Sequence, residues 1–237
     1  MRFLLKDLLP DSLLRQLRSW KGKYFDSFSY ESFAQEGEDM ILRRIFDQQD
    51  CGFYVDVGAH HPKRFSNTYF FYKAGWNGIN IDAMPGSMAL FNKERPRDIN
   101  LEKPISSKKQ KLTYYAFNEP ALNGFSREVS EVRDGFNSYR VEFTKDLETT
   151  TLEEVLSENL IDQQVIDFLS VDVEGLDFDV IRSINLDIYK PRVIVIEILD
   201  ATLPEIFDSE IFNFLVSYGY SCYAKSINSV IFKSGQF

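Results

Sequence analysis

The chain has 237 residues, of which 44% are hydrophobic and 15% aromatic, enough for one sizeable hydrophobic core. Its formal net charge is -9, which argues against DNA or RNA as a partner because nucleic-acid-binding surfaces are normally basic. The two cysteines, Cys51 and Cys222, cannot build a disulfide scaffold, and no apolar run reaches the roughly 18 residues of a membrane-spanning helix. Asp7, Pro10 and Asp11 interrupt the start of the chain, which makes it a poor signal peptide. We therefore expect a cytoplasmic protein.

Residues 1–30 form a basic leader on an otherwise acidic chain. Pro10 divides residues 3–20 into two short amphipathic helices. The apolar residues of the second helix fall on one face: Leu13, Leu14, Leu17 and Trp20. We expect this face to pack against the following domain; the alternative is a peripheral contact with a membrane surface or a partner protein.

Residues 31–237 are expected to form one domain in which helices and strands alternate. The first half predicts, in order, a helix at 38–49, a strand at 53–57, a helix at 67–75, a strand at 77–83, a helix at 87–95 and a strand at 98–106. The run 53–57 is apolar on both faces, which is typical of a strand in the middle of a parallel sheet. Residues 109–145 break the alternation, and we interpret them as an insertion that carries two exposed strands.

The second half restores the alternation. It predicts a helix at 149–159, a strand at 165–175, a helix at 177–184, a strand at 191–199, a helix at 205–220 and a tight hairpin within 220–232. Thr150, followed three residues later by Glu153, fits a capping box at the start of the first of these helices. The fold class predicted is α/β: a doubly wound, mostly parallel, seven-stranded sheet with a C-terminal antiparallel hairpin.

Polar residues follow the predicted strands, where a parallel sheet of this kind binds its ligand. They are Asp56 to Pro62, Asp82, Ser106 and Ser107, Asp172 to Gly175, and Glu197. Carboxylates also favour the starts of helices as N-caps, so a purely structural set is the alternative.

The turn after the first strand, Asp56-Val57-Gly58-Ala59-His60-His61-Pro62, bears on the cofactor. A dinucleotide-binding fold uses G-x-G-x-x-G because the pyrophosphate must approach bare backbone at a helix N-terminus. This turn has one glycine, and Asp56 would repel a pyrophosphate. A cationic ligand without phosphate fits the turn better, and no nucleotide-hydrolysing P-loop motif is present.

The acid-x-Gly turn, with a second acid ending the next strand, resembles the class I S-adenosylmethionine (SAM) methyltransferases. More narrowly, the segments FAQEGEDMIL, FYVDVGAHHPKRFSNTYFFYKAGWNGINIDAMP, TTTLEEVL and DFLSVDVEGLDFDVI resemble the FkbM family of methyltransferases. This resemblance implies a Rossmann-like fold, SAM as the cofactor, and O-methylation of a hydroxyl on a sugar, a glycan or a similar small acceptor. A module that binds SAM without turnover and a nicotinamide-dependent Rossmann oxidoreductase are the alternatives.

The resemblance also implies roles for individual residues. Gly58 would let the backbone approach the aminoacyl part of SAM, and Asp82 would accept both ribose hydroxyls. In many SAM turns a second glycine stands near the place of Pro62. The cofactor-binding residues implied are Asp56, Gly58, Ala59, Asp82, Ser106, Gln35 and Asp39.

Asp172 and Glu174 end the fourth predicted strand, where methyltransferases meet the methyl acceptor. A hydroxyl is a weak nucleophile, so a general base would help the reaction. Asp172, His60 and Glu174 are the catalytic candidates. An imidazole has the better intrinsic pKa, whereas a carboxylate must be desolvated to act as a base. We expect one histidine of the pair His60–His61 to reach the pocket, the other serving the loop.

A metal ion is the competing use of these acids. Asp172, Glu197 and a histidine could hold Mg²⁺, but we do not expect a metal. Zinc needs three or four protein ligands, and the chain has no third histidine and no cysteine near His60. The composition leaves the oligomeric state open.

Overall fold

A computed structural model describes residues 29–237, and residues 33–237 form one compact unit. The helices expected within residues 3–20 lie outside the described residues. Within the described part, no helix has the length and apolar character needed to cross a bilayer.

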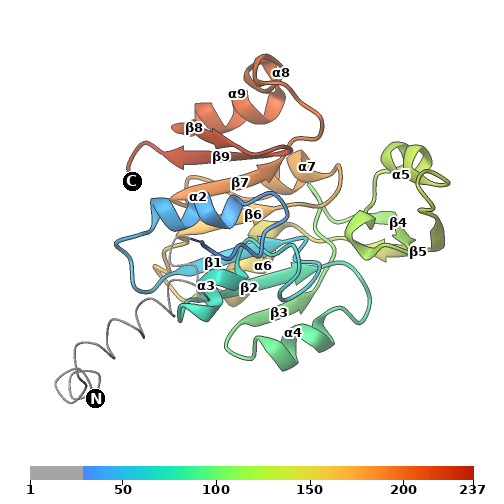
Figure 1. The fold of residues 1–237 in the computed structure, drawn as a ribbon, viewed down its shortest axis with the longest axis horizontal. Helices are drawn as coiled ribbons and strands as arrows, with labels where there is room; N and C mark the ends of the chain where they lie inside the picture. The colour runs from blue at the N-terminus through green and yellow to red at the C-terminus, as the bar shows by residue number, and fades with distance from the viewer. Residues whose placement is uncertain (1–28) are drawn as a thin grey trace, which may run out of the picture. The chain divides into compact units, whose positions relative to one another are not determined.

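The central sheet contains seven strands in the order β3-β2-β1-β6-β7-β9-β8 (Figure 1). The first five strands in this order, β3, β2, β1, β6 and β7, are parallel to their neighbours. Strand β9 runs antiparallel to both β7 and β8. The strands are β1 (Phe53–Val57), β2 (Asn77–Asp82), β3 (Ile99–Glu102), β6 (Phe168–Val171), β7 (Val193–Glu197), β8 (Tyr220–Lys225) and β9 (Ser229–Ser234). The predicted fold class is confirmed. Strand order reverses between β1 and β6, so a ligand is expected at their carboxyl ends.

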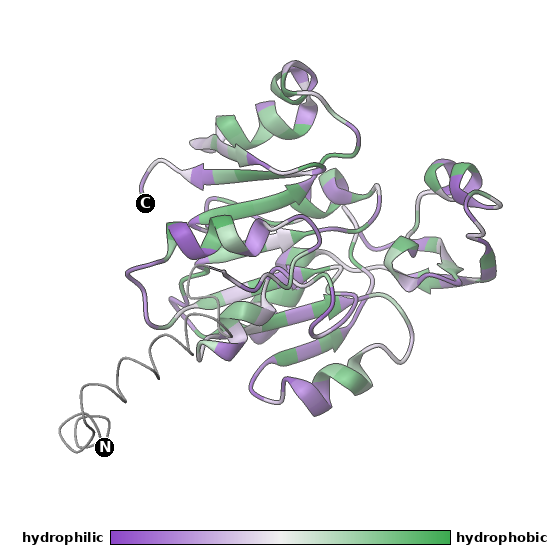
Figure 2. Ribbon diagram, viewed as in Figure 1, coloured by the Kyte–Doolittle hydropathy of each residue, from purple (hydrophilic) through white to green (hydrophobic). Residues whose placement is uncertain are grey.

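Helices cover both faces of the sheet. On one face, aliphatic side chains of the strands, such as Val55 and Val57 of β1, form one hydrophobic cluster with residues of α6, α7, α8 and α9. The other face packs Tyr54 and Phe168 against Leu42 of α2, Phe46 directly after it, and aromatic residues of α3. The helices are α2 (Glu38–Ile45), α3 (Tyr69–Lys73), α4 (Met88–Glu94), α6 (Leu152–Asn159), α7 (Asp177–Arg182), α8 (Leu203–Asp208) and α9 (Glu210–Ser217). The strands between them are largely hydrophobic because both faces are covered (Figure 2).

A charged network is buried beside the aromatic cluster. The Arg95 guanidinium is fully buried; it donates to Asp98 at 2.8 Å, to the Tyr54 hydroxyl at 2.8 Å and to the Thr68 hydroxyl at 3.0 Å. Thr68 in turn donates to Asp56 at 2.8 Å. Buried charges are tolerated when they are paired and hydrogen-bonded, and this chain of contacts satisfies both conditions.

The segment between β3 and α6 forms a second, two-stranded antiparallel sheet of β4 (Lys111–Phe117) and β5 (Val141–Glu148). Between these strands lie a 3-10 helix, η1 (Pro120–Leu122), and helix α5 (Arg127–Arg133). We call residues 107–149 the inserted segment. Its two ends meet, because the Ser106 N–H donates to the Thr150 carbonyl at 3.0 Å and the Thr149 N–H to the Gln110 carbonyl at 2.8 Å.

The N-cap of α6 lies one residue later than predicted, and the predicted pairing of Thr150 with Glu153 in a capping box is wrong. Thr151, rather than Thr150, is the N-cap, and its hydroxyl accepts the Glu154 N–H at 3.2 Å. Thr150 instead donates its hydroxyl to the Glu154 carboxylate at 2.7 Å. The backbone of Thr150 is occupied by the contact with Ser106, which explains why the helix starts later than the repeated threonines suggested.

Candidate active site

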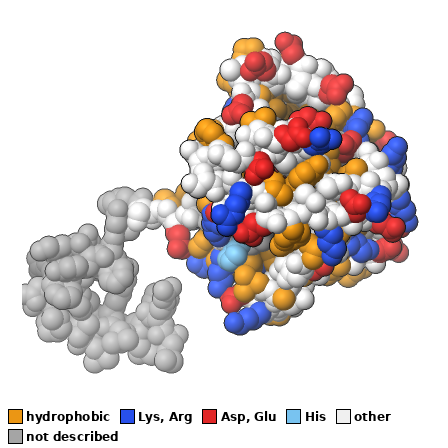
Figure 3. All heavy atoms as spheres, turned by 90° about the vertical axis from the view of Figure 1, so that its right-hand side faces the viewer, with side chains coloured by type: hydrophobic (Ala, Val, Ile, Leu, Met, Phe, Trp, Pro, Cys, Tyr) orange, Lys and Arg blue, Asp and Glu red, His pale blue; other side chains and the backbone are white. Residues whose placement is uncertain are grey.

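A pocket of about 390 Å³ opens at the carboxyl ends of β1, β2 and β6. Its volume is within the range of small-molecule sites. The ends of these three strands form its base, and the inserted segment forms one wall. On the side of the molecule that carries the inserted segment, acidic, basic and hydrophobic side chains are interleaved (Figure 3). The lining includes Gln35, Gly58, His60, Asp82, Met84, Leu90, Ile105, Tyr114, Asn123, Phe125, Asp172 and Glu174.

Both the backbone conformation at position 58 and the closeness of neighbouring atoms require glycine there. Its φ is +83°, a conformation that L side chains rarely adopt. A Cβ atom at this position would lie 1.7 Å from the carbonyl oxygen of Asp172. The turn after β1 therefore contacts the end of β6 through bare backbone, which brings the predicted cofactor side and acceptor side of the pocket together.

Asp82 ends β2, and its carboxylate accepts hydrogen bonds from the loop after β1 and from the loop after β2. One carboxylate oxygen accepts the His60 N–H at 2.8 Å, and the other accepts the Met84 N–H at 2.7 Å. Burial raises the pKa of Asp82, and these two hydrogen bonds oppose that effect. A carboxylate has about four acceptor positions, so lone pairs remain for the hydroxyls of a ligand.

The two histidines of the turn differ in role. His60 lines the pocket, and its Nε2 atom is buried without a hydrogen-bond partner among the described residues. Burial, with the charge of Arg64, lowers the pKa of His60 to about 4, so its imidazole is neutral at physiological pH. His61 does not line the pocket; its Nδ1 accepts the N–H groups of Lys63 and Arg64 at 3.0 and 2.9 Å.

Four residues expected at the cofactor do not line the pocket: Asp56, Ala59, Ser106 and Asp39. Asp56 belongs to the buried network through Thr68, and Ala59 packs with Met88 and Phe91. Ser106 is fully buried, and its hydroxyl accepts from Gln110 at 3.1 Å. Asp39 is also fully buried and accepts the Phe33 N–H at 2.8 Å.

The loop after β6 carries the acidic residues of the pocket. The Asp177 carboxylate accepts the N–H groups of Val173 and Gly175, each at 3.0 Å, and so holds the loop in shape. Glu174 has a φ of +56° and forms an ion pair with Arg133 of α5 at 2.6 Å. Asp172 opens onto the pocket and has no such cationic partner among the described residues.

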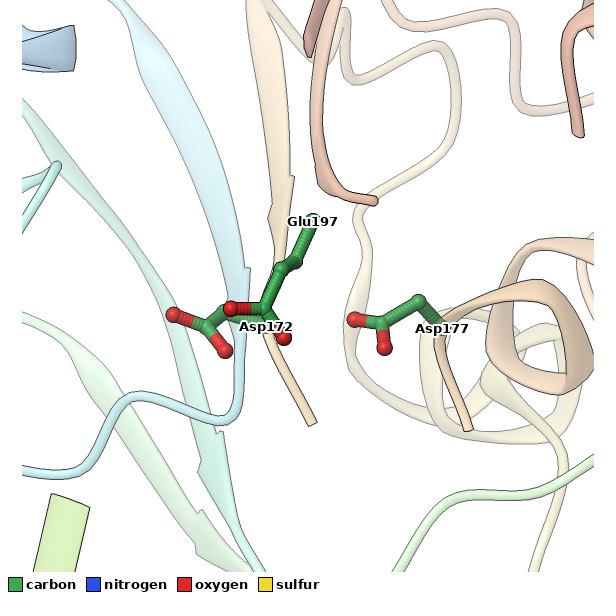
Figure 4. Close-up of side chains that lie close together, drawn as sticks. All are labelled: Asp172, Asp177 and Glu197. Atoms are coloured by element: carbon green, nitrogen blue, oxygen red, sulfur yellow. The ribbon is translucent and has the colours of Figure 1, made fainter. Parts of the chain in front are cut away.

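Asp172, Asp177 and Glu197 bring ligand atoms within 4.8 Å of one another (Figure 4). Like charges this close cannot all ionise. Burial, with the charge of Asp172, raises the pKa of Glu197 to about 10, and its Oε2 atom has no hydrogen-bond partner among the described residues. For Asp172, desolvation by the surrounding protein and the charge of Glu174 raise the pKa well above the ordinary value.

The same three carboxyl groups could hold a metal ion. Their oxygens suit Mg²⁺, but both oxygens of Asp177 already accept backbone N–H groups. The set also differs from the one weighed from the sequence, since Asp177 takes the place of a histidine.

From the sequence, the aromatic residues of the inserted segment allow two interpretations, a surface that stacks on a sugar or ordinary packing, and two of them line the pocket. Tyr114 and Phe125 lie edge to face, with ring centroids 5.0 Å apart, and both line the pocket. Asn123 lies beside them and accepts the Phe117 N–H at 2.7 Å. The aromatic composition of this segment was the available signal, but it does not distinguish a pocket wall from ordinary packing.

A mostly parallel seven-stranded sheet, with its pocket at the carboxyl ends of β1, β2 and β6, is the arrangement of a class I methyltransferase. The sequence model described as "Methyltransferase FkbM domain" matches residues 56–222, more than half of the chain. The chain therefore belongs to the FkbM methyltransferase family, as predicted, and this family assignment indicates SAM as the cofactor.

A comparison with curated proteins found no match. Among solved structures, the chain is similar to an O-methyltransferase from Bacillus cereus in complex with SAH, at 9% sequence identity and a TM-score of 0.41. The match covers 95% of this chain and 91% of that chain.

Proposed function

We propose that this protein transfers the methyl group of SAM to a hydroxyl of a neutral sugar, a glycan or a similar small polyhydroxyl acceptor. The observation that carries the proposal is the position of Asp172. Its carboxyl group opens onto the pocket and has a raised pKa, and the residue directly follows β6, where its own carbonyl oxygen lies against Gly58. The proposed base and the proposed cofactor turn thus belong to one pocket.

The residues at the carboxyl ends of β1 and β2 fit SAM. Asp82 has free lone pairs for the ribose hydroxyls, and Gly58 presents bare backbone. Apolar side chains of Met84, Leu90 and Ile105 line the same pocket and suit an adenine ring. When bound, SAM supplies an electrophilic methyl group on a positively charged sulfur, which the acidic surroundings favour.

Asp172 is assigned as the general base that accepts the proton of the acceptor hydroxyl. A raised pKa makes a carboxylate a better base near neutral pH. Glu174, paired with Arg133, is a positioning residue in this scheme. His60, with its lowered pKa, is a weak base and is assigned to align the reactants through a hydrogen bond.

The acceptor is expected to be uncharged because of the charges at this end of the pocket. Asp172 and Glu174 line this end of the pocket, and the nearby cation Arg133 is already paired with Glu174. An anionic acceptor would meet repulsion there. The edge-to-face pair Tyr114–Phe125 gives an aromatic wall on which the apolar face of a sugar ring can lie.

The test is methyl transfer from labelled SAM to a panel of glycosides by the wild-type chain and by Asp172→Asn. We expect transfer to a sugar hydroxyl, a loss of kcat of about 10²–10⁴-fold in the variant, and unchanged SAM affinity. The matched control is Asp179→Asn on α7, whose carboxylate pairs with Arg182 outside the pocket. Binding of SAM without transfer to any hydroxyl would favour the non-catalytic alternative, and equal rates in both variants would remove Asp172 as the base.

A further inference from the structure

The loop that carries Asp172 is in direct contact with the inserted segment. Two glycines mark the places of closest approach. A Cβ atom at Gly124 would lie 3.0 Å from the Cβ of Glu174, and one at Gly175 would lie 3.2 Å from the Cβ of Ser126. Real Cβ atoms rarely come this close to their neighbours, so the two backbones approach as far as glycine alone permits.

Arg133, the last residue of α5, forms an ion pair between the inserted segment and the loop that carries Asp172. Its guanidinium contacts Glu174 at 2.6 Å, and the two side chains are only 20% and 14% exposed. Another ion pair of the same helix, Arg127–Glu131, is 73% and 62% exposed. Water screens the exposed pair, whereas the partly buried one is both stronger and more costly to break.

Glu174 connects this ion pair to the reacting group. It lies two residues after Asp172, lines the same pocket, and holds a backbone conformation unusual for a residue other than glycine. Without Arg133 its charge would stand uncompensated beside Asp172.

We propose that Arg133 is a positioning residue for the acceptor side of the pocket. Through its ion pair it holds Glu174 and so fixes the position of the loop that carries Asp172. The same ion pair compensates the negative charge of Glu174 beside Asp172. This inference rests on the proposed function. Arg133 does not line the pocket, so its effect on methyl transfer runs through Glu174.

Several charged groups act on Asp172, and the experiment must separate Arg133 from them. After desolvation, the charge of Glu174 on the same loop has the largest effect on the pKa of Asp172. The other carboxylates that act on it are Asp177 at the start of α7, Asp56 on β1 and Glu38 on α2, and Glu197 of β7 lies within 4.8 Å. Loss of Arg133 should raise the pKa of Asp172 because Glu174 becomes uncompensated. Loss of the Glu174 charge should lower it.

The experiment compares Arg133→Gln, Glu174→Gln and the double variant with the wild-type chain. The matched control is Arg127→Gln, which removes a cation from the same helix without touching the loop. Two measurements are made on each: the titration of the Asp172 carboxyl carbon by NMR, and kcat with separate KM values for SAM and acceptor. Arg133→Lys tests rescue, since it keeps the charge but loses the bidentate geometry of the guanidinium.

For Arg133→Gln we expect a higher Asp172 pKa, an acid limb of the kcat profile moved to higher pH, and a loss of kcat of about 10–100-fold at an unchanged KM for SAM. Arg127→Gln should match the wild type, and Arg133→Lys should recover part of the rate. In the Glu174→Gln background, the Arg133 substitution should have little further effect.

The proposal is overturned if Asp172 titrates alike in Arg133→Gln and Arg127→Gln, or if the effect of Arg133 persists undiminished in the Glu174→Gln background. If Arg133→Gln does not fold, Glu174→Gln and Arg133→Lys decide the question through the same titration. Failure of the wild-type chain to methylate any sugar overturns the proposed function alone, because the titration of Asp172 needs no acceptor.

Discussion

At the scale of single residues, Gly58 combines two requirements that are usually separate. A non-glycine residue at φ +83° costs roughly 1–2 kcal/mol of strain. The overlap of a Cβ atom with the Asp172 carbonyl oxygen, at 1.7 Å, adds a further cost because neither backbone can move freely. We expect Gly58→Ala to lower the free energy of unfolding by about 3 kcal/mol or more, measured by urea denaturation.

Gly75 provides the control for this prediction. Its φ is +104°, but a Cβ atom there would meet nothing within 4 Å. Gly75→Ala should therefore cost only the strain of about 1–2 kcal/mol. Equal losses in the two variants would show that the contact between the β1 turn and Asp172 is loose.

The second residue-scale prediction concerns Glu197 and pH. The folded chain keeps a proton on this group up to about pH 10, whereas an ordinary glutamate releases it near 4.5. The stability that this proton contributes is complete below the lower value and is lost as the pH rises toward the higher one. Glu197→Gln should thus become more stable relative to the wild type as pH rises between pH 5 and 9, by up to about 1.4 kcal/mol per pH unit in urea unfolding.

The control for this pH dependence of stability is Glu142, an exposed glutamate of β5. Glu142→Gln should leave the pH dependence of the wild-type chain unchanged. Parallel stability curves for the wild type and Glu197→Gln would contradict the protonated state of Glu197.

Residue types at strand ends predicted five of the pocket residues, and the family resemblance implied a sixth, Gln35. The five are Gly58, His60, Asp82, Asp172 and Glu174. The four other residues expected at the cofactor, Asp56, Ala59, Ser106 and Asp39, are buried away from the pocket because of contacts that a single sequence does not reveal. Asp56, for example, lies one strand position from the rim, and its partner Thr68 is twelve residues away along the chain. The partner of a buried carboxylate is set by tertiary contact rather than by spacing.

At the scale of elements, Arg95 contacts three separate parts of the fold. Its contacts join β1 through Tyr54, the start of α3 through Thr68, and the approach to β3 through Asp98. Arg95→Met would leave the Asp98 carboxylate buried without its cation. We expect a loss of about 3–5 kcal/mol in the free energy of unfolding, measured by chemical denaturation.

The matched substitution is Arg44→Met on α2, whose side chain is 81% exposed and pairs with Asp47. It should change the free energy of unfolding by less than about 1 kcal/mol. If Arg95→Met is equally mild, the network is penetrated by water and carries little of the stability.

The order and type of the main helices and strands could be predicted because their apolar periodicity is local. Element ends were less predictable. Three consecutive threonines, Thr149 to Thr151, each fit an N-cap, and contacts with Gln110 and Ser106 across the base of the inserted segment determine that Thr151 takes the position. The inserted segment was expected to carry two strands, but its packing against the loop after β6 depends on glycines at 124 and 175 whose partners lie far away in the sequence.

At the scale of the whole molecule, ligand binding should couple to global stability. A ligand that binds only the folded state at about 100 times its Kd adds about 2.7 kcal/mol. For a domain of this size we expect SAM at that concentration to raise Tm by about 5–10 °C in calorimetry. Asp82→Asn should reduce the shift because it loses an acceptor that faces the pocket.

NAD at the same concentration serves as the control ligand and should leave Tm unchanged. A shift with NAD and none with SAM would reverse the choice between methyltransferase and oxidoreductase. A cytoplasmic location stays a prediction, and so does the contact expected of residues 3–20, which lie outside the described part of the chain.

The inserted segment leaves and rejoins the sheet at one point, where Ser106 and Thr150 are hydrogen-bonded. A piece of chain whose two ends are neighbours can be replaced without changing the path of the rest. Exchange of residues 107–149 between members of the family would then alter the wall that faces the acceptor while leaving the β1 and β2 ends untouched. Such chimeras must exchange the loop after β6 as well, because Arg133 and Glu174 are matched to each other. The segment and that loop therefore form one structural unit, and under the proposed function we expect a graft of both together to be the smallest that moves acceptor preference from one enzyme to another.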